Sequence, residues 1–157
     1  LAWLRHLTRR GLLNTRREAR EVAAAMSRYQ VAAASPEVAI ATLSGGNQQK
    51  VILGRVFARK PSVLVLSEPT RGIDVGAKSE IYRLLQEAAE AGAGIIMISS
   101  ELPEILGIAD RIAVFFEGHL KGIFDAGTAS EESLAHVAVA GDLPPSLSPS
   151  SPTGAHP

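Results

Sequence analysis

The chain has 157 residues, of which 46% are hydrophobic and 20% charged, a composition typical of one globular domain with a sizeable core. Its 16 basic and 16 acidic residues cancel, so no net field draws it toward nucleic acid or anionic lipid. The absence of cysteine excludes a disulfide framework and a thiolate metal site, and no apolar run approaches the roughly 20 residues of a membrane span.

The first third of the sequence is expected to be mostly helical. The opening LAWLRHLTRRGL has neither a signal-peptide cleavage pattern nor a domain start, which indicates a truncated chain. Asn14 is suited to cap a helix over TRREAREVAAAMSRYQV, where Val22, Met26 and Tyr29 share one face. The glycine pair in LSGGNQQKVILGRVFARK precedes a second helix of about three turns.

The middle of the sequence alternates short apolar runs with amphipathic stretches. It predicts, in order, a strand at 63–66, a helix at 75–91, a strand at 94–99, a short helix at 103–106 and a strand at 111–116. This alternation is typical of parallel strands joined by crossover helices. Asp74 is expected to cap the longer helix and Gly92 to close it. The core stripe of that helix comprises Ile81, Leu84, Leu85 and Ala88.

The sequence changes character toward its C-terminus. EGHL indicates a hairpin turn, so HLKGIFD is expected to form an antiparallel edge strand. From Gly141 the composition becomes rich in proline and serine, and such a segment cannot bury enough apolar surface to fold. Residues 141–157 are therefore predicted to be a disordered tail.

The stretch LSGGNQQK, residues 43–50, combines features that suit a phosphate. Adjacent glycines let backbone N–H groups approach an anion, Ser44 adds a hydroxyl donor, and the following helix directs its positive dipole end to the same place. A Ser-Gly-Gly turn that merely caps an ordinary helix is the alternative, and the turn residues alone favour it.

The full string favours the phosphate site over the plain capping turn, because LSGGNQQK resembles the signature motif of ATP-binding cassette (ABC) ATPases. The stretch PSVLVLSEPTRGID resembles the Walker B strand, catalytic glutamate and D-loop of the same family, and IIMISSELPEILGIADRIAVFFEGHLKG resembles its switch and closing strands. The resemblance covers about residues 40–125. Three segments are similar in sequence to the second ATPase half of double-cassette importers of ribose, galactose and xylose: NQQK, EPTRGIDVGAK and SSELPE.

The resemblance implies an α/β fold, a partial P-loop NTPase-like ABC ATPase. Residues 1–140 would form the partial domain, with the helical subdomain and signature helix in about 1–60 and the Walker B, D-loop and switch-strand core in 61–126. No Gly-Lys pair occurs in the 157 residues, so the P-loop GxxxxGK[ST] is absent from them.

By this resemblance, the chain would meet its ATP across an interface. The P-loop of an opposing domain would hold the nucleotide, and this chain would contact it in trans. The contacting residues would be Ser44, Gly45, Gly46 and Gln48.

The resemblance also assigns roles near the Walker B strand. Glu68 would act as general base toward the attacking water, the alternative being an exposed acid at a strand end. Gly72 and Asp74 would lie in the D-loop at the interface between the two domains, although helix capping explains Asp74 equally well.

Two positions depart from the family pattern. Ser67 replaces the aspartate that would hold Mg²⁺, and we interpret it as a locally bonded strand-end serine, so no metal ligand is assigned. Ser100 occupies the switch position where most ABC ATPases have histidine, although the sugar-importer subgroup often has Ser-Ser-Glu there. The histidines lie elsewhere and are expected at the surface: His6, His119, His136 and His156.

We therefore expect the ATPase component of a sugar import system, using ATP and Mg²⁺ in the full assembly. Its partners would be another ATPase half, a membrane permease and, indirectly, a sugar-binding protein, at the cytoplasmic face of the membrane and without nucleic acid. One alternative is an inactive truncated product with unpaired sheet edges. Another is a non-transport ABC protein of ribosomes or DNA, which the signature ending, the D-loop, Ser100 and the neutral charge disfavour.

Overall fold

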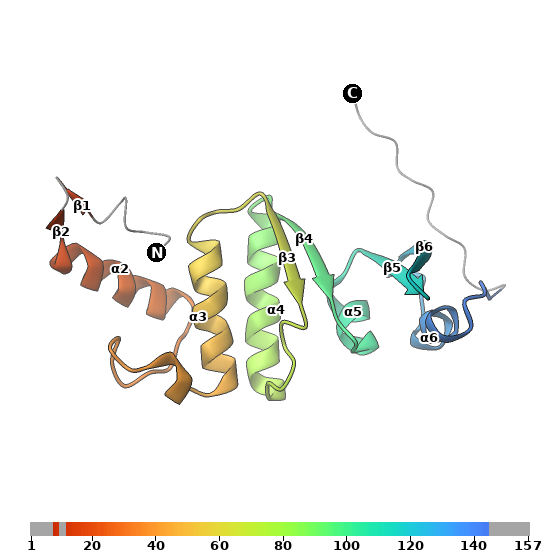
Figure 1. Cartoon of the computed structure of the whole chain (residues 1–157), viewed down its shortest axis with the longest axis horizontal. Helices are drawn as coiled ribbons and strands as arrows, with labels where there is room; N and C mark the ends of the chain where they lie inside the picture. The colour runs from red at the N-terminus through yellow and green to blue at the C-terminus, as the bar shows by residue number, and fades with distance from the viewer. Residues whose placement is uncertain (1–7, 10–11, 145–157) are drawn as a thin grey trace, which may run out of the picture. The chain divides into compact units, whose positions relative to one another are not determined.

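The computed structural model describes residues 8–9 and 12–144, which form two compact units that meet in sequence between Ile98 and Ser99 (Figure 1). The first unit contains β1 (Thr8–Arg9), β2 (Leu12–Leu13), α2 (Thr15–Arg28), η1 (Ile40–Thr42), α3 (Gly45–Phe57), β3 (Val63–Ser67), α4 (Val75–Glu90) and β4 (Gly94–Ile98). The second contains α5 (Leu102–Ile108), β5 (Arg111–Phe116), β6 (His119–Asp125) and α6 (Glu131–Ala140). His6, His156 and residues 145–157 of the predicted tail lie outside the described residues.

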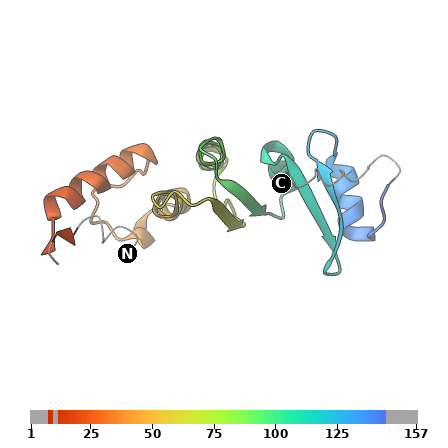
Figure 2. The ribbon, with the colours of Figure 1, turned by 90° about the horizontal axis from the view of Figure 1, so that it is seen from above.

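The sheet of the first unit is parallel, as the alternation of strand and helix predicts. β3 and β4 pair in register from Val63 opposite Gly94 to Ser67 opposite Ile98, and α4 makes the crossover between them. The inner strand residues pack against a core from α3 and α4 whose members are Leu53, Ile81 and Leu85. Figure 2 shows α3 and α4 almost end-on beside the two strands.

The start of the first unit is tied to the core by an aromatic residue. Asn14 caps α2 as expected, accepting a 3.0 Å hydrogen bond from the Arg17 N–H, but α2 itself buries no residue. Tyr29, just after the helix, is 7% exposed and lies 6.3 Å from the Phe57 ring. A Cβ at Gly54 would come within 2.7 Å of the Tyr29 ring, so the glycine makes room for this contact.

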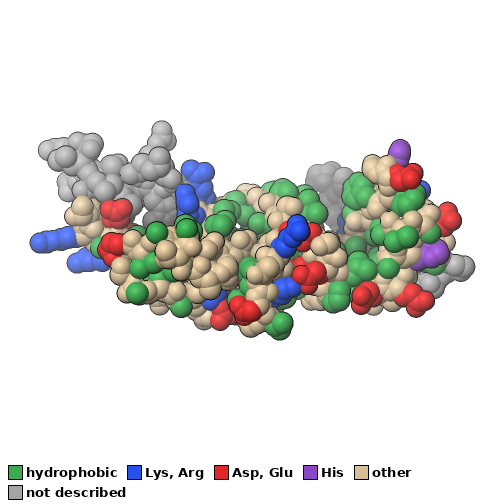
Figure 3. Space-filling model, turned by 60° about the horizontal axis from the view of Figure 1, so that its bottom comes forward, with side chains coloured by type: hydrophobic (Ala, Val, Ile, Leu, Met, Phe, Trp, Pro, Cys, Tyr) green, Lys and Arg blue, Asp and Glu red, His purple; other side chains and the backbone are tan. Residues whose placement is uncertain are grey.

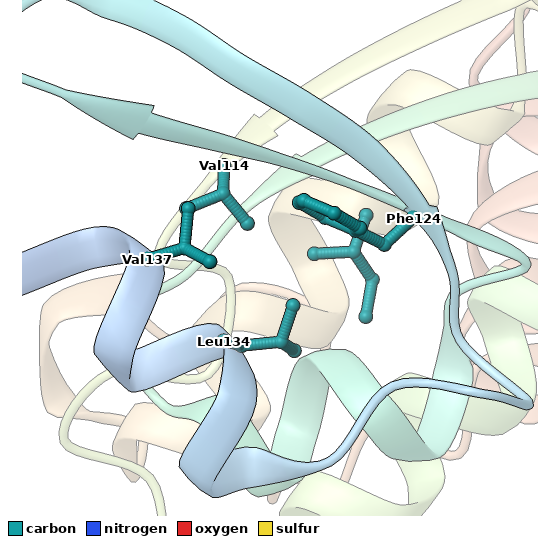
Figure 4. Packing of buried hydrophobic residues seen from close by; sticks show 5 residues of the cluster. Val114, Phe124, Leu134 and Val137 are labelled. Carbon is teal, nitrogen blue, oxygen red and sulfur yellow. The ribbon is translucent and has the colours of Figure 1, made fainter. Parts of the chain in front are cut away.

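The second unit is a hairpin covered by helices. β5 and β6 are antiparallel, as predicted, with Arg111 opposite Asp125 and Phe116 opposite His119. In Figure 4 the side chains of Val114 and Phe124 from the hairpin meet those of Leu134 and Val137 from α6. α6 was not predicted from the sequence; its two core residues are fully buried against the hairpin and α5.

The two signs of charge are unevenly distributed. On the face shown in Figure 3, basic side chains lie mostly over the first unit and acidic ones predominate over the second, with hydrophobic side chains between them. Within residues 8–9 and 12–144, no helix is both long and apolar enough to cross a membrane.

Candidate functional site

The N-terminus of α3 presents Ser44 to the solvent. Ser44 is the N-cap residue, with extended backbone angles, and its hydroxyl oxygen accepts hydrogen bonds from the backbone N–H of Asn47 at 3.5 Å and from the Asn47 Nδ2 at 2.9 Å. The first N–H groups of a helix have no partner inside the helix, and because the Ser44 hydroxyl accepts that of Asn47, those of Gly45 and Gly46 are left for an anion. Ser44 and Gly45 are exposed, whereas Gly46 is buried.

The signature and D-loop stretches lie together in the structure. A Cβ added to Gly46 would lie 2.6 Å from the Ala77 Cβ in the first turn of α4, and one added to Gly45 would lie 3.6 Å from the Gly72 carbonyl oxygen. Asp74 caps α4 by accepting a 2.9 Å hydrogen bond from the Ala77 N–H, which confirms its predicted capping role. Gly46 is therefore required for the close approach of α3 to α4.

A buried lysine fixes the same two helices. Lys50, the last residue of LSGGNQQK, forms an ion pair with Glu80 on α4, and its side chain is 8% exposed. Its ammonium group also donates a 3.0 Å hydrogen bond to the Gln30 carbonyl oxygen, just beyond α2. One side chain thus holds α3, α4 and the segment after α2 together, and this sets the direction in which the α3 N-terminus points.

Two neighbouring amides are used differently in the structure. The Gln48 Nε2 donates to the Leu43 carbonyl oxygen at 2.8 Å, so this predicted ATP contact stabilises the turn before α3. Asn47, which the sequence analysis did not single out, bonds both to Ser44 and to the Ala32 N–H at 2.8 Å. No local pattern could identify it, because its second partner lies 15 residues away.

Glu68 stands directly after β3 in an unusual backbone conformation. Its φ is +48°, in the left-handed region that costs a residue with a Cβ about 1–3 kcal/mol. Its N–H donates a 2.7 Å hydrogen bond to the Ile98 carbonyl oxygen of β4, and Pro69 and Thr70 after it are buried. The sheet and the following turn therefore hold the carboxylate at the C-terminal end of the parallel strands, where α/β sheets bind ligands.

The neighbouring residues do not form a cation site. Ser67 is exposed at the end of β3, on the face that also exposes Val63 and Val65. In the described part of the chain, no group of three or more histidine, aspartate or glutamate side chains could hold a metal ion. With a neutral hydroxyl at position 67, Glu68 has no carboxylate directly before it at the end of β3, which does not fit a Mg²⁺ site on this chain alone.

The switch position lies in the second unit and is held by its neighbours. Ser100 is exposed; the Ser99 hydroxyl donates to buried Glu104 and accepts a 3.1 Å hydrogen bond from the Glu101 N–H. The short turn around Ser100 is therefore fixed from both sides. His119 and His136 are exposed, as expected.

Comparisons with known proteins find that this chain is similar to ATP-binding proteins of ABC transporters. The ABC transporter family model matches residues 4–71. The chain is 49% identical over 135 residues to the xylose import ATP-binding protein XylG of Burkholderia cenocepacia, and 49% over 132 residues to the ribose import ATP-binding protein RbsA of Bacillus subtilis. These matches cover 85% and 84% of this chain but 26% and 27% of the relatives, so it spans about a quarter of their length.

A solved structure supports the fold. The dimeric bacterial ABC transporter cassette MJ0796 superposes with a TM-score of 0.63 at 19% identity, covering 78% of this chain and 53% of that one. The partial ABC ATPase fold is confirmed, and the relatives are sugar import ATP-binding proteins as predicted.

Proposed function

We propose that this chain, a member of the ABC transporter ATP-binding family, presents Ser44 and the N-terminal amides of α3 to an ATP held by the P-loop of a partner cassette. The exposed Ser44 hydroxyl at a helix N-terminus carries the proposal, because that arrangement suits the terminal phosphate of a nucleotide. The 157 residues contain no P-loop sequence, so the phosphates need a second polypeptide segment.

The donors of this chain act on the phosphate side of the reaction. The Ser44 hydroxyl and the helix N-terminus stabilise negative charge that develops on the terminal phosphate as it is transferred to water. Gly46 and Lys50 hold that N-terminus against α4. Where ATP is bound with Mg²⁺, the metal offsets phosphate charge, and its ligands come from the partner site.

Glu68 belongs to the second, composite site of the assembly. A carboxylate at this strand end is placed to orient a water for attack on a nucleotide. Because Ser67 is neutral, we assign the lower activity to that site. Working hydrolysis then depends on the site to which this chain contributes Ser44.

The printed names of the relatives favour sugar import over the other functions considered. Xylose and ribose import ATP-binding proteins match over most of this chain, and its net charge of zero gives no attraction for nucleic acid. By analogy, its partners are a second cassette, a membrane permease and a sugar-binding protein that reaches it through the permease. The chain would lie peripherally at the cytoplasmic face of the membrane.

The isolated 157-residue chain is expected to show no ATP turnover and at best weak nucleotide binding. The β-phosphate requires the P-loop backbone and lysine, which these residues do not contain. The rate of Mg²⁺-dependent phosphate release from the purified chain should equal that of its Glu68→Gln variant. Hydrolysis above that control would show a complete site within these residues and would refute the proposal.

A further inference from the structure

The side-chain amide of Asn47 makes two hydrogen bonds at the α3 N-terminus, and the proposed function gives this residue no role. Its Oδ1 accepts the Ala32 N–H at 2.8 Å, and an N–H can be met only by the oxygen of the amide. The amide nitrogen is thereby turned toward Ser44, whose hydroxyl oxygen it reaches at 2.9 Å. The loop after α2 thus determines which end of the amide faces Ser44.

The proton of the Ser44 hydroxyl follows from this orientation. A serine hydroxyl has one hydrogen to donate and two lone pairs that accept. The Asn47 Nδ2 and the Asn47 backbone N–H, at 2.9 and 3.5 Å, both point at its oxygen. The hydroxyl hydrogen is therefore directed away from Asn47, and within the described part of the chain no acceptor is recorded for it.

We propose that Asn47 is a positioning residue that fixes Ser44 as a hydrogen-bond donor to the anionic group at the α3 N-terminus. This inference rests on the proposed function, because the anion would be the terminal phosphate of a nucleotide held by the partner cassette. Without the amide, the hydroxyl could rotate and accept from the backbone while its hydrogen points elsewhere. With the amide, the donor is oriented before the phosphate arrives, so no reorganisation is needed at that moment.

An isosteric substitution separates the two bonds of Asn47. In Asn47→Asp the carboxylate still accepts the Ala32 N–H, but it cannot donate to Ser44 and instead attracts the hydroxyl hydrogen. In Asn47→Leu both bonds are lost. If Asn47 only anchors the loop after α2, Asn47→Asp should behave as wild type and Asn47→Leu should be impaired.

The test measures ATP turnover by the assembled ATPase, this chain together with its P-loop-bearing cassette. Hydrogen bonds to charged groups are strong enough that Ser44→Ala should lower kcat about 10- to 100-fold. Asn47→Asp should lower kcat by a similar factor, while the KM for MgATP, set mainly by the P-loop, changes less than about threefold. Amide exchange at Ala32 should remain slow in Asn47→Asp, which shows that the loop stays in place.

The double variant Ser44→Ala/Asn47→Asp distinguishes action through Ser44 from simple charge repulsion. If Asn47 acts through Ser44, adding Asn47→Asp to Ser44→Ala should change kcat by less than about twofold. An equal loss in both backgrounds, or wild-type turnover in Asn47→Asp beside a strong Ser44→Ala defect, would overturn the role of Asn47 and leave the proposed function standing. Unchanged turnover in Ser44→Ala would instead refute the proposed function itself.

Discussion

Replacing Ser44 with arginine is expected to abolish ATP turnover by the assembled ATPase. The substitution removes the hydroxyl donor and places a long cation at an exposed helix N-terminus, where it blocks approach of the phosphate to the backbone N–H groups. Loss of the hydroxyl donor alone should cost about 10- to 100-fold in rate, and the steric block adds to this loss. Phosphate release from the assembly at saturating MgATP measures the effect.

Two control variants show whether the loss of turnover in Ser44→Arg is specific to that position. Ser27→Arg, on an exposed position of α2, adds the same cation away from the site and should leave turnover unchanged. Ser67→Asp should also change turnover little, because it restores a carboxylate only in the site to which we assign lower activity. Equal rates for Ser44→Arg and Ser27→Arg would contradict the role of Ser44, and a large gain from Ser67→Asp would show that the two sites are assigned the wrong way round.

Replacing Gly46 with alanine is expected to lower both stability and turnover. The added Cβ would lie 2.6 Å from the Ala77 Cβ, too close for two methyl groups, so α3 must move away from α4. Overpacking of this kind costs about 1–3 kcal/mol, and here it displaces the helix end that carries Ser44. Urea unfolding followed by circular dichroism gives the loss of stability, and phosphate release gives the loss of turnover.

A rescue and a matched control accompany this variant. Ala77→Gly removes the opposing methyl group and should restore much of the stability and turnover of Gly46→Ala. Gly76→Ala, in the first turn of α4, places its Cβ 3.4 Å from the Asp74 carboxylate oxygen, a tolerable distance, and should be neutral. A stable and active Gly46→Ala protein would contradict the packing role of Gly46.

Local signals in the sequence predicted most of the first unit correctly. The apolar runs at β3 and β4, the Asp74 cap and the buried Ile81, Leu84 and Leu85 follow from strand and helix periodicity and from N-cap chemistry. The proximity of Gly45 to the Gly72 carbonyl oxygen was not predicted, because the two glycines belong to separate motifs 27 residues apart in the sequence.

The features that the sequence analysis did not identify depend on distant partners. α6 has a Ser130 capping box, but its burial comes from the β5–β6 hairpin and α5, which only tertiary packing brings against it. The hydrogen bond from the Ala32 N–H to Asn47 and the one from the Lys50 ammonium group to the Gln30 carbonyl oxygen join segments separated by 15 and 20 residues. The left-handed backbone of Glu68 also has no sequence signal, because that conformation is imposed by the sheet and the buried turn after it.

Ser44 is proposed to contact a nucleotide that a partner cassette binds, and a cysteine introduced at this position tests that contact. The chain has no cysteine, so Ser44→Cys introduces a single reactive group at an exposed position. The measurement is the rate of maleimide labelling of that thiol, with and without MgATP and the P-loop-bearing cassette. We predict strong protection only when both are present. Protection by MgATP alone, or full labelling with both present, would contradict the account.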